Sequence, residues 1–293
     1  MVEQTKNAEQ ENFPVASKLI LPHLRPAIMS FYDFARTSDD IADSDTLTGV
    51  EKMEMLNEME AVLCRDAKGN DFSVCAEKLV DALKERPLCV QSAKDLLKAF
   101  RMDATNQTYD TFDELMRYCR YSAGSVGRFM LDLHQESPTT YLTSDALCAA
   151  LQLNNHLQDC KDDFIRLKRF YLPKEWMKEE NLTCESLLAD KENPALRRVF
   201  NKMISGIDGL LTDATPLPMA ITGRGLRMQV CVIYRLAKKL SYRLKKQDIL
   251  TKKVELRPVD WFFAFTFGAL GGLRRKKIKC PINKTSLPPK QSF

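Results

Sequence analysis

The stretch that decides the fold runs from Ala150 to Pro173, ALQLNNHLQDCKDDFIRLKRFYLP. Its pattern predicts a helix, with Leu151, Leu153 and Leu157 packed to the sides or behind. A polar stripe on such a helix costs free energy unless it faces water, a metal ion or a ligand. One wall of a site is therefore expected here. At about 100° per residue, five polar side chains fall within roughly 100° of arc: Gln152, Asn155, His156, Asp159 and Asp163.

A second segment, from about Pro26 to Ala42, gathers its polar residues on one helix face in the same way. Asp39 and Asp43 are four residues apart, so their carboxylates point the same way, about 6 Å apart, and repel unless cations lie between them. The DDIAD sequence at 39–43 is thus either a helix end that reaches solvent or half of a Mg²⁺ site.

Two facing acidic helices would hold several Mg²⁺ ions, because Mg²⁺ prefers carboxylate oxygens and water and shares the phosphate of a substrate. Such a cluster would neutralise diphosphate as it leaves carbon. Asp39 and Asp43 would form one wall, and Asp159 and Asp163 the other. Arg36, one turn before Asp39, would contact either the carboxylates or the diphosphate.

The rest of the chain predicts more helices and a single all-α domain over residues 1–273, followed by a tail at 274–293. No alternating strand pattern, repeat or long linker interrupts it, and 44% hydrophobic residues allow a sizeable core. One helix is expected over 112–134, with the small residues at 122–127 marking tight packing or a kink beside a ligand.

The C-terminal segment is apolar and then basic. The run from Val259 to Leu273 is shorter than the roughly 20 residues that span a membrane, so we expect a core helix that at most touches one. From Arg274 onward there are seven Lys or Arg and no acids, whereas the body holds 37 bases against 39 acids. The tail is predicted to be disordered, and either solubilises the chain or touches anionic lipid. No aromatic interleaving suggests nucleic-acid binding.

The cysteines and the N-terminus indicate a compartment. The nine cysteines are scattered and form no CxxC pair, which suggests neither a disulfide framework nor a zinc site. The polar start, MVEQTKNAEQENF, has no apolar signal-peptide core. A cytoplasmic protein is expected, with peripheral contact at the inner membrane face as the open question.

At this point a family resemblance can be stated. The sequence resembles the squalene and phytoene synthase family, head-to-head prenyl synthases with an all-α isoprenoid-synthase bundle around a central apolar cavity. The resemblance rests on four motifs in the family's order: YDFARTSDDIAD at 32–43, YCRYSAGSVG at 118–127, LQLNNHLQDCKDD at 151–163 and RFYLP at 169–173.

The resemblance implies roles by position in these motifs. Mg²⁺-binding acids would be Asp39, Asp43, Asp159 and Asp163. Substrate-binding residues on the diphosphate side would be Arg36, Arg169 and Tyr171, with Tyr32 beside them. Polar residues beside the reacting carbons would be Tyr118, Gln152 and Asn155.

Within the family, NFPVAS at 12–17, NNHLQDCKDD at 154–163 and LKRFYLP at 167–173 look most like the bacterial hydroxysqualene synthases of hopanoid biosynthesis. That resemblance implies ionisation of presqualene diphosphate, rearrangement of the cation and capture by water, with Mg²⁺ and without NADPH. Gln158 stands where the family commonly has an arginine. His156 stands at a usually apolar place, and either orients the quenching water or is a satisfied structural histidine.

Alternatives remain open on the sequence alone. A squalene synthase would reduce the cation with NADPH, and GALGGL at 268–273 is no dinucleotide fingerprint, although reductive family members lack one too. A presqualene diphosphate synthase would join two farnesyl diphosphates in the same pocket. Two alternatives involve a different function altogether. The chain could be a non-catalytic helical scaffold, or a helical bundle that binds iron, although the Glu-x-x-His pairs of such iron sites are missing from the sequence.

Overall fold

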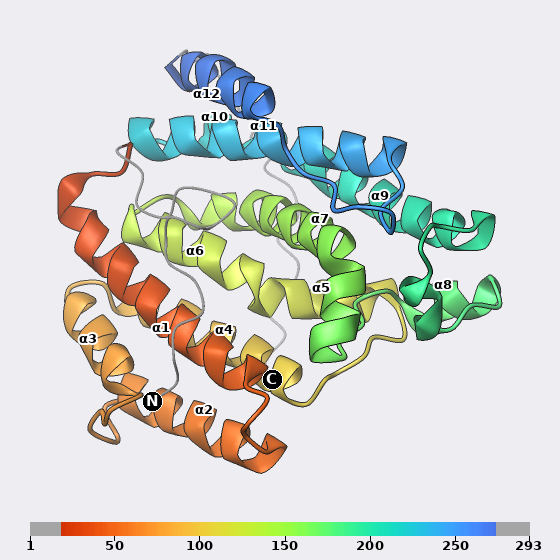
Figure 1. Ribbon diagram of the computed structural model, residues 1–293. Coiled ribbons are helices and arrows are strands. Elements are labelled where there is room, and N and C mark those ends of the chain that lie inside the picture. Colours follow the sequence, from red (N-terminus) through yellow and green to blue (C-terminus); the bar gives the residue numbers. More distant parts are fainter. Residues whose placement is uncertain (1–18, 274–293) are drawn as a thin grey trace, which may run out of the picture.

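The computed structural model describes residues 19–273, which form helices and no strand (Figure 1). This confirms the all-α prediction for that part of the chain. Short 3₁₀ turns occur at Pro22–Leu24, Pro138–Thr140 and Cys184–Leu188. The α-helices are α1 (Arg25–Asp43), α2 (Gly49–Leu63), α3 (Val74–Ala82), α4 (Pro87–Ala104), α5 (Phe112–Tyr121), α6 (Ala123–Leu133), α7 (Tyr141–Leu167), α8 (Lys174–Glu179), α9 (Pro194–Asp213), α10 (Leu217–Ala220), α11 (Arg224–Lys246) and α12 (Pro258–Leu273).

The 27-residue helix α7 runs through the middle of the bundle and packs against α6, α9 and α11 (Figure 1). Its Leu153 and Leu157 are fully buried, as their place behind the polar stripe predicted. A second apolar core lies where α1 packs against α3 and α4, with Phe34 and Ile41 fully buried. Each acidic helix is thus held by an apolar face, which leaves its polar face to turn toward the other.

The RFYLP motif is aimed by a reversal at the end of α7. Lys168 has a left-handed backbone (φ 56°), a conformation that commonly ends helices. The amide of Arg169 then donates to the carbonyl of Asp163 at 3.3 Å. Arg169 and Tyr171 are buried, because the reversal turns them back toward α1 and α4.

The helix predicted over 112–134 is broken at Ser122, which has ψ −95° and separates α5 from α6. Hydroxyls compete for the backbone there: Ser122 Oγ donates to the carbonyl of Tyr118 at 3.1 Å, and Ser125 Oγ to that of Ser122 at 2.7 Å. Beyond the break α6 lies so close to α7 that a Cβ on Gly127 would be 2.5 Å from the sulfur of Cys148. The small residues therefore provide both a kink and tight packing.

The prediction that 259–273 is a core helix is wrong. Helix α12 lies across the outer side of α11 at the edge of the molecule (Figure 1) and leaves Phe262 64% exposed and Phe267 52% exposed. Within 19–273 no other helix covers its outer face. None of the helices in that range is long and apolar enough to cross a membrane. The predicted tail at 274–293 lies outside the described residues, and the domain boundary at 273 stays a prediction.

Candidate active site

A polar cavity of about 440 Å³ lies between α1, α4, α7 and the start of α6. Every site residue that the sequence predicted lines it. From α1 and α5 come Tyr32, Arg36, Asp39, Asp43 and Tyr118. From α7 and the segment after it come Gln152, Asn155, His156, Asp159, Asp163, Arg169 and Tyr171.

The α1 wall combines crowded carboxylates with one guanidinium. Arg36 forms ion pairs with Asp39 at 2.8 Å and with Asp40 at 2.6 Å. Burial, followed by the neighbouring charge of Asp43, nevertheless raises the pKa of Asp39 to about 7. The negative charge on this wall is therefore only partly compensated by Arg36.

Arg169 joins the two acidic walls. It forms an ion pair with Asp43 at 2.6 Å and donates to the carbonyl of Ala42 at 3.3 Å, so the motif after α7 is fastened to the end of α1. The pKa of Asp163 is raised to about 7, chiefly by burial and then by Asp159, and Asp43 on the opposite helix adds to the rise. The charge of Asp43 on α1 thus acts on Asp163 on α7.

Lys253 is a cation of this site that the sequence did not reveal. Its ammonium forms an ion pair with Asp159, and the amide of Gln158 donates to the carbonyl of Val254 one residue later. The segment before α12 is therefore bound to α7 at two neighbouring points. At the position where the family resemblance implied an arginine, this chain has Gln158, whose amide binds the segment that bears Lys253. No pattern around TKKVELRP marks Lys253 before the fold is known.

Asp103, on α4, was also missed and organises the tyrosines of the site. Its two carboxylate oxygens accept hydrogen bonds of 3.0 Å from the hydroxyls of Tyr118 and Tyr171. Burial raises its pKa to about 6, against the opposing charge of Arg169. A signal existed: Asp103 follows Leu96 and Phe100 on the apolar face of α4, and a carboxylate there needs partners.

His156 is a buried, neutral ring on the cavity wall. It stacks on Tyr171 with ring centres 3.7 Å apart, and burial, with Arg169 adding to it, lowers its pKa to about 3. Its Nε2 lies 3.2 Å from the amide nitrogen of Gln152, one turn earlier on the stripe. The ring therefore has a packing partner and a polar partner while it faces the cavity, which leaves both sequence interpretations standing.

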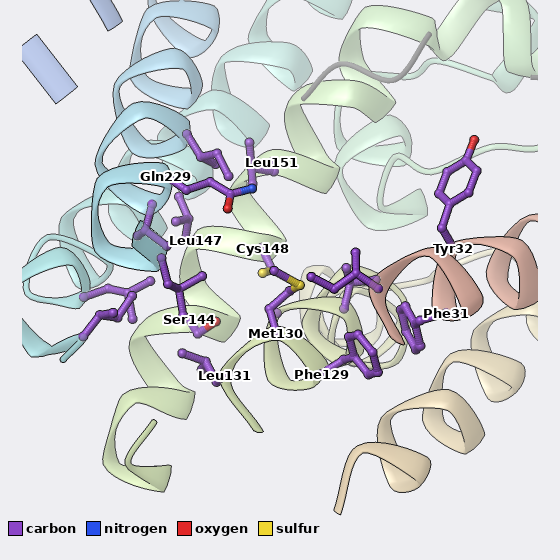
Figure 2. A pocket seen from close by; sticks show the side chains of 18 of the residues that line it. Phe31, Tyr32, Phe129, Met130, Leu131, Ser144, Leu147, Cys148, Leu151 and Gln229 are labelled. Atoms are coloured by element: carbon purple, nitrogen blue, oxygen red, sulfur yellow. The ribbon is translucent and has the colours of Figure 1, made fainter. Parts of the chain in front are cut away.

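An apolar cavity of about 280 Å³ lies next to the polar one, and Figure 2 shows its lining side chains. Helices α1, α6, α7 and α11 form its walls, with Phe31 and Phe129 stacked 3.8 Å apart at one side. The apolar cavity predicted for the bundle is thus present. The two cavities share five lining residues, namely Tyr32, Ala35, Val126, Cys148 and Leu151.

The donor set of the polar cavity suits a hard divalent cation. Carboxylates from two helices line one space, and burial, followed by the charge of the neighbouring carboxylate, raises the pKa of Asp39 and of Asp163. Such acids would be relieved by a cation. Within 19–273 no three His, Cys, Asp or Glu side chains already converge on one point. Asp39, Asp43 and Asp159 instead pair with Arg36, Arg169 and Lys253.

Known proteins are similar to this chain over most of its length. A squalene/phytoene synthase family model matches residues 6–260. A hydroxysqualene synthase of Rhodopseudomonas palustris is 42% identical over 280 residues, 95% of this chain and 94% of that protein. Another, of Sinorhizobium fredii, is 41% identical over 251 residues, 86% and 85% of the two chains. The solved squalene synthase HpnC from Alicyclobacillus acidocaldarius has a TM-score of 0.70 at 27% identity, covering 82% of this chain and 90% of that one.

Proposed function

Because the chain belongs to the squalene/phytoene synthase family and is an enzyme of prenyl diphosphate processing, we propose that it converts presqualene diphosphate and water to hydroxysqualene and diphosphate. The observation that carries the proposal is an apolar cavity that shares five lining residues with the polar cavity. An apolar space suits a long prenyl chain, and a space lined by cations and carboxylates suits a diphosphate. The relatives named hydroxysqualene synthase support water as the final reactant.

Three cations would bind the diphosphate. Arg36, Arg169 and Lys253 each hold a carboxylate of the polar cavity, so each is already placed beside the space that the head group would fill. The planar guanidinium group of arginine can donate two parallel hydrogen bonds to phosphate oxygens, and the ammonium group of lysine adds a compact positive charge. The sequence-based role of Tyr32 fits its position on the border of the two cavities.

Four carboxylates would hold Mg²⁺: Asp39, Asp43, Asp159 and Asp163. When bound there, the ion supplies the charge that neutralises the departing diphosphate. Arg36, Arg169 and Lys253, which now pair with Asp39, Asp43 and Asp159, would then be available to the phosphate oxygens.

The carbocation left behind would lie beside aromatic rings and amides. Tyr118 and Tyr171 line this region, with both hydroxyls bound to Asp103 and the ring of Tyr171 stacked on His156, so aromatic side chains would lie near the cation. Gln152 and Asn155 provide amide groups close by. Water adds its oxygen to the cation and loses one proton to solvent or to the released diphosphate, which balances the reaction without a reductant.

The function is tested by supplying purified protein and Mg²⁺ with either presqualene diphosphate or farnesyl diphosphate, with and without NADPH. Mass spectrometry of the lipid is expected to show hydroxysqualene from presqualene diphosphate in the absence of NADPH. Squalene that forms only with NADPH, or product that forms only from farnesyl diphosphate, would assign the chain to one of the other two steps.

A role for His156 can be read from the product. If the ring orients the quenching water, His156→Phe should fill about the same space and keep the stacking on Tyr171. The product should then shift about tenfold from the alcohol toward the alkene that forms when the cation loses a proton instead of adding water. Gas chromatography of the lipids measures that ratio. Alcohol formed at the original rate and proportion would mean that His156 only packs.

Lys253 is expected to act on substrate binding. Lys253→Gln keeps much of the side chain but removes the charge, and should raise KM for the prenyl diphosphate about tenfold. Steady-state kinetics at fixed Mg²⁺ measure this, with Lys252→Gln, an exposed neighbour, as the matched control. Equal KM values for the two variants would remove Lys253 from the head-group site.

A further inference from the structure

Helix α12 has two different faces. Asp260, Ala264 and Gly268 follow one another at intervals of four residues and face α11, where a Cβ on Gly268 would be 2.8 Å from a methyl of Val232. Asp260 is buried and forms an ion pair with Arg243 at 2.6 Å. These contacts fix the rotation of the helix, so its other face has one defined composition.

The outward face of α12 is aromatic. Phe262, Phe263, Phe267 and Leu270 are between 51% and 64% exposed, and Phe263 and Phe267 stack on each other with ring centres 5.9 Å apart. A contiguous exposed patch of large apolar side chains is unusual on a protein that has no further contact to make with it. Elsewhere in 19–273, clusters of aromatic side chains belong to the two apolar cores or pack against them, whereas the cluster on α12 is exposed to solvent.

Basic residues of α11 border this aromatic face. Arg235, Lys238 and Lys239 line a groove together with Phe263 and Phe267, and all three are exposed. The acid that lines the same groove, Asp260, is buried and pairs with Arg243 at 2.6 Å and with Lys239 at 3.7 Å, which leaves Arg235 and Lys238 to face solvent. The groove therefore presents positive charge beside exposed rings, and the sequence that follows α12 adds seven bases and no acid.

We propose that α12 and the basic edge of α11 dock on an anionic lipid surface. Phenyl and leucyl side chains enter the boundary between head groups and acyl chains, and lysines and arginines pair with the lipid phosphates. The charge of this face favours an anionic lipid surface over a second copy of the chain. If two copies met through this face, their basic residues would repel each other. The helix lies flat along α11, as an interfacial helix does, and does not insert across the bilayer.

The docking face adjoins the candidate active site. Trp261 of α12 lines a cavity of about 230 Å³ that shares Leu151 and Asn155 with the polar cavity, and Lys253 lines it too. The prenyl substrate and the water-insoluble product of the proposed reaction would therefore enter and leave the active site close to the membrane surface. That consequence rests on the proposed function, whereas docking itself does not.

Sedimentation with vesicles tests the docking of the full chain. Vesicles of phosphatidylcholine mixed with phosphatidylglycerol should bind the protein, and vesicles of phosphatidylcholine alone should bind it far less. Phe263→Gln with Phe267→Gln should weaken binding at least about tenfold, because two rings no longer leave water. Arg235→Gln with Lys238→Gln should weaken binding to the anionic vesicles by roughly tenfold and reduce its salt dependence, while the contacts of Asp260 that hold α12 remain.

The matched control is Leu88→Gln, which removes a 71% exposed apolar side chain from α4, and it should bind as the original chain does. Absence of binding to the anionic vesicles would overturn the proposal. Binding that the phenylalanine variant retains would overturn it as well, since the basic tail alone would then suffice. Loss of a dimer in that variant, without any vesicle binding, would make the occupant a second copy. Failure of this assay would leave the proposed reaction untouched, because no turnover is measured.

Discussion

Asp159→Asn is expected to lower turnover by about 100- to 1000-fold while the chain remains folded. Asp159 lines the polar cavity on α7, and it is one of the four carboxylates proposed to hold Mg²⁺. Asparagine keeps the shape but gives up the negative charge that a divalent cation requires. Steady-state kinetics with presqualene diphosphate at saturating Mg²⁺ measure the loss, and circular dichroism checks the fold.

The matched control lies on the same helix. Asp162→Asn changes an exposed carboxylate that does not line the cavity, and it should leave turnover within about twofold of the original value. Because Asp159→Asn also breaks the pair with Lys253, the Lys253→Gln variant shows how much of the loss comes from that pair. Near-normal turnover in Asp159→Asn would contradict the assignment of Asp159 to the metal.

Asp103→Leu is expected to reduce the free energy of unfolding by about 2–6 kcal/mol. The substitution leaves the hydroxyls of Tyr118 and Tyr171 buried without their acceptor, and each such loss costs about 1–3 kcal/mol. The carboxylate's own cost of burial, seen in its pKa of about 6, disappears with it, so the lower part of the range is expected. Denaturation in urea measures the difference.

Asp103→Asn separates stability from chemistry. Its carbonyl accepts from one tyrosine hydroxyl and its amide donates to the other, so the variant should lose less stability than Asp103→Leu. If both variants were as stable as the original chain, the two hydroxyls would not depend on Asp103. Because both rings line the polar cavity, turnover of Asp103→Asn also reports how far their exact placement matters.

The helical periodicity of the sequence was sufficient to predict many of the residues that line the site. The stripes on 26–42 and 150–163 placed carboxylates, amides and arginine on two faces, and those faces line one cavity. Such stripes are readable because a helix with an apolar back can turn its polar face only toward water or a ligand. Arg169 and Tyr171 depended on the family resemblance, since the reversal at Lys168 that aims them has no periodic signal.

The features that sequence reasoning missed depend on contacts between distant segments. Lys253 reaches Asp159 from a segment 94 positions further along the chain, and nothing local to it indicates that approach. The break at Ser122 depends on hydroxyls that bond backbone carbonyls, a choice that tertiary packing decides. Helix α12 was misjudged because an apolar sequence was assumed to be buried, although within 19–273 nothing covers its outer face.

The departures from the family pattern now have a physical context. Gln158 faces the carbonyl of Val254 and so serves to hold the lysine-bearing segment, while His156 lies on the cavity wall as a neutral ring. These two positions distinguish this chain's site from that of a relative with an arginine and an apolar residue. Product control is therefore expected to depend on both.

Incorporation of oxygen-18 from labelled water is the measurement that tests the proposed reaction most directly. Purified protein, Mg²⁺ and presqualene diphosphate in oxygen-18 water, without NADPH, should give hydroxysqualene that carries one labelled oxygen atom. An unlabelled alcohol, or a hydrocarbon that appears only when NADPH is added, would contradict capture of the carbocation by water.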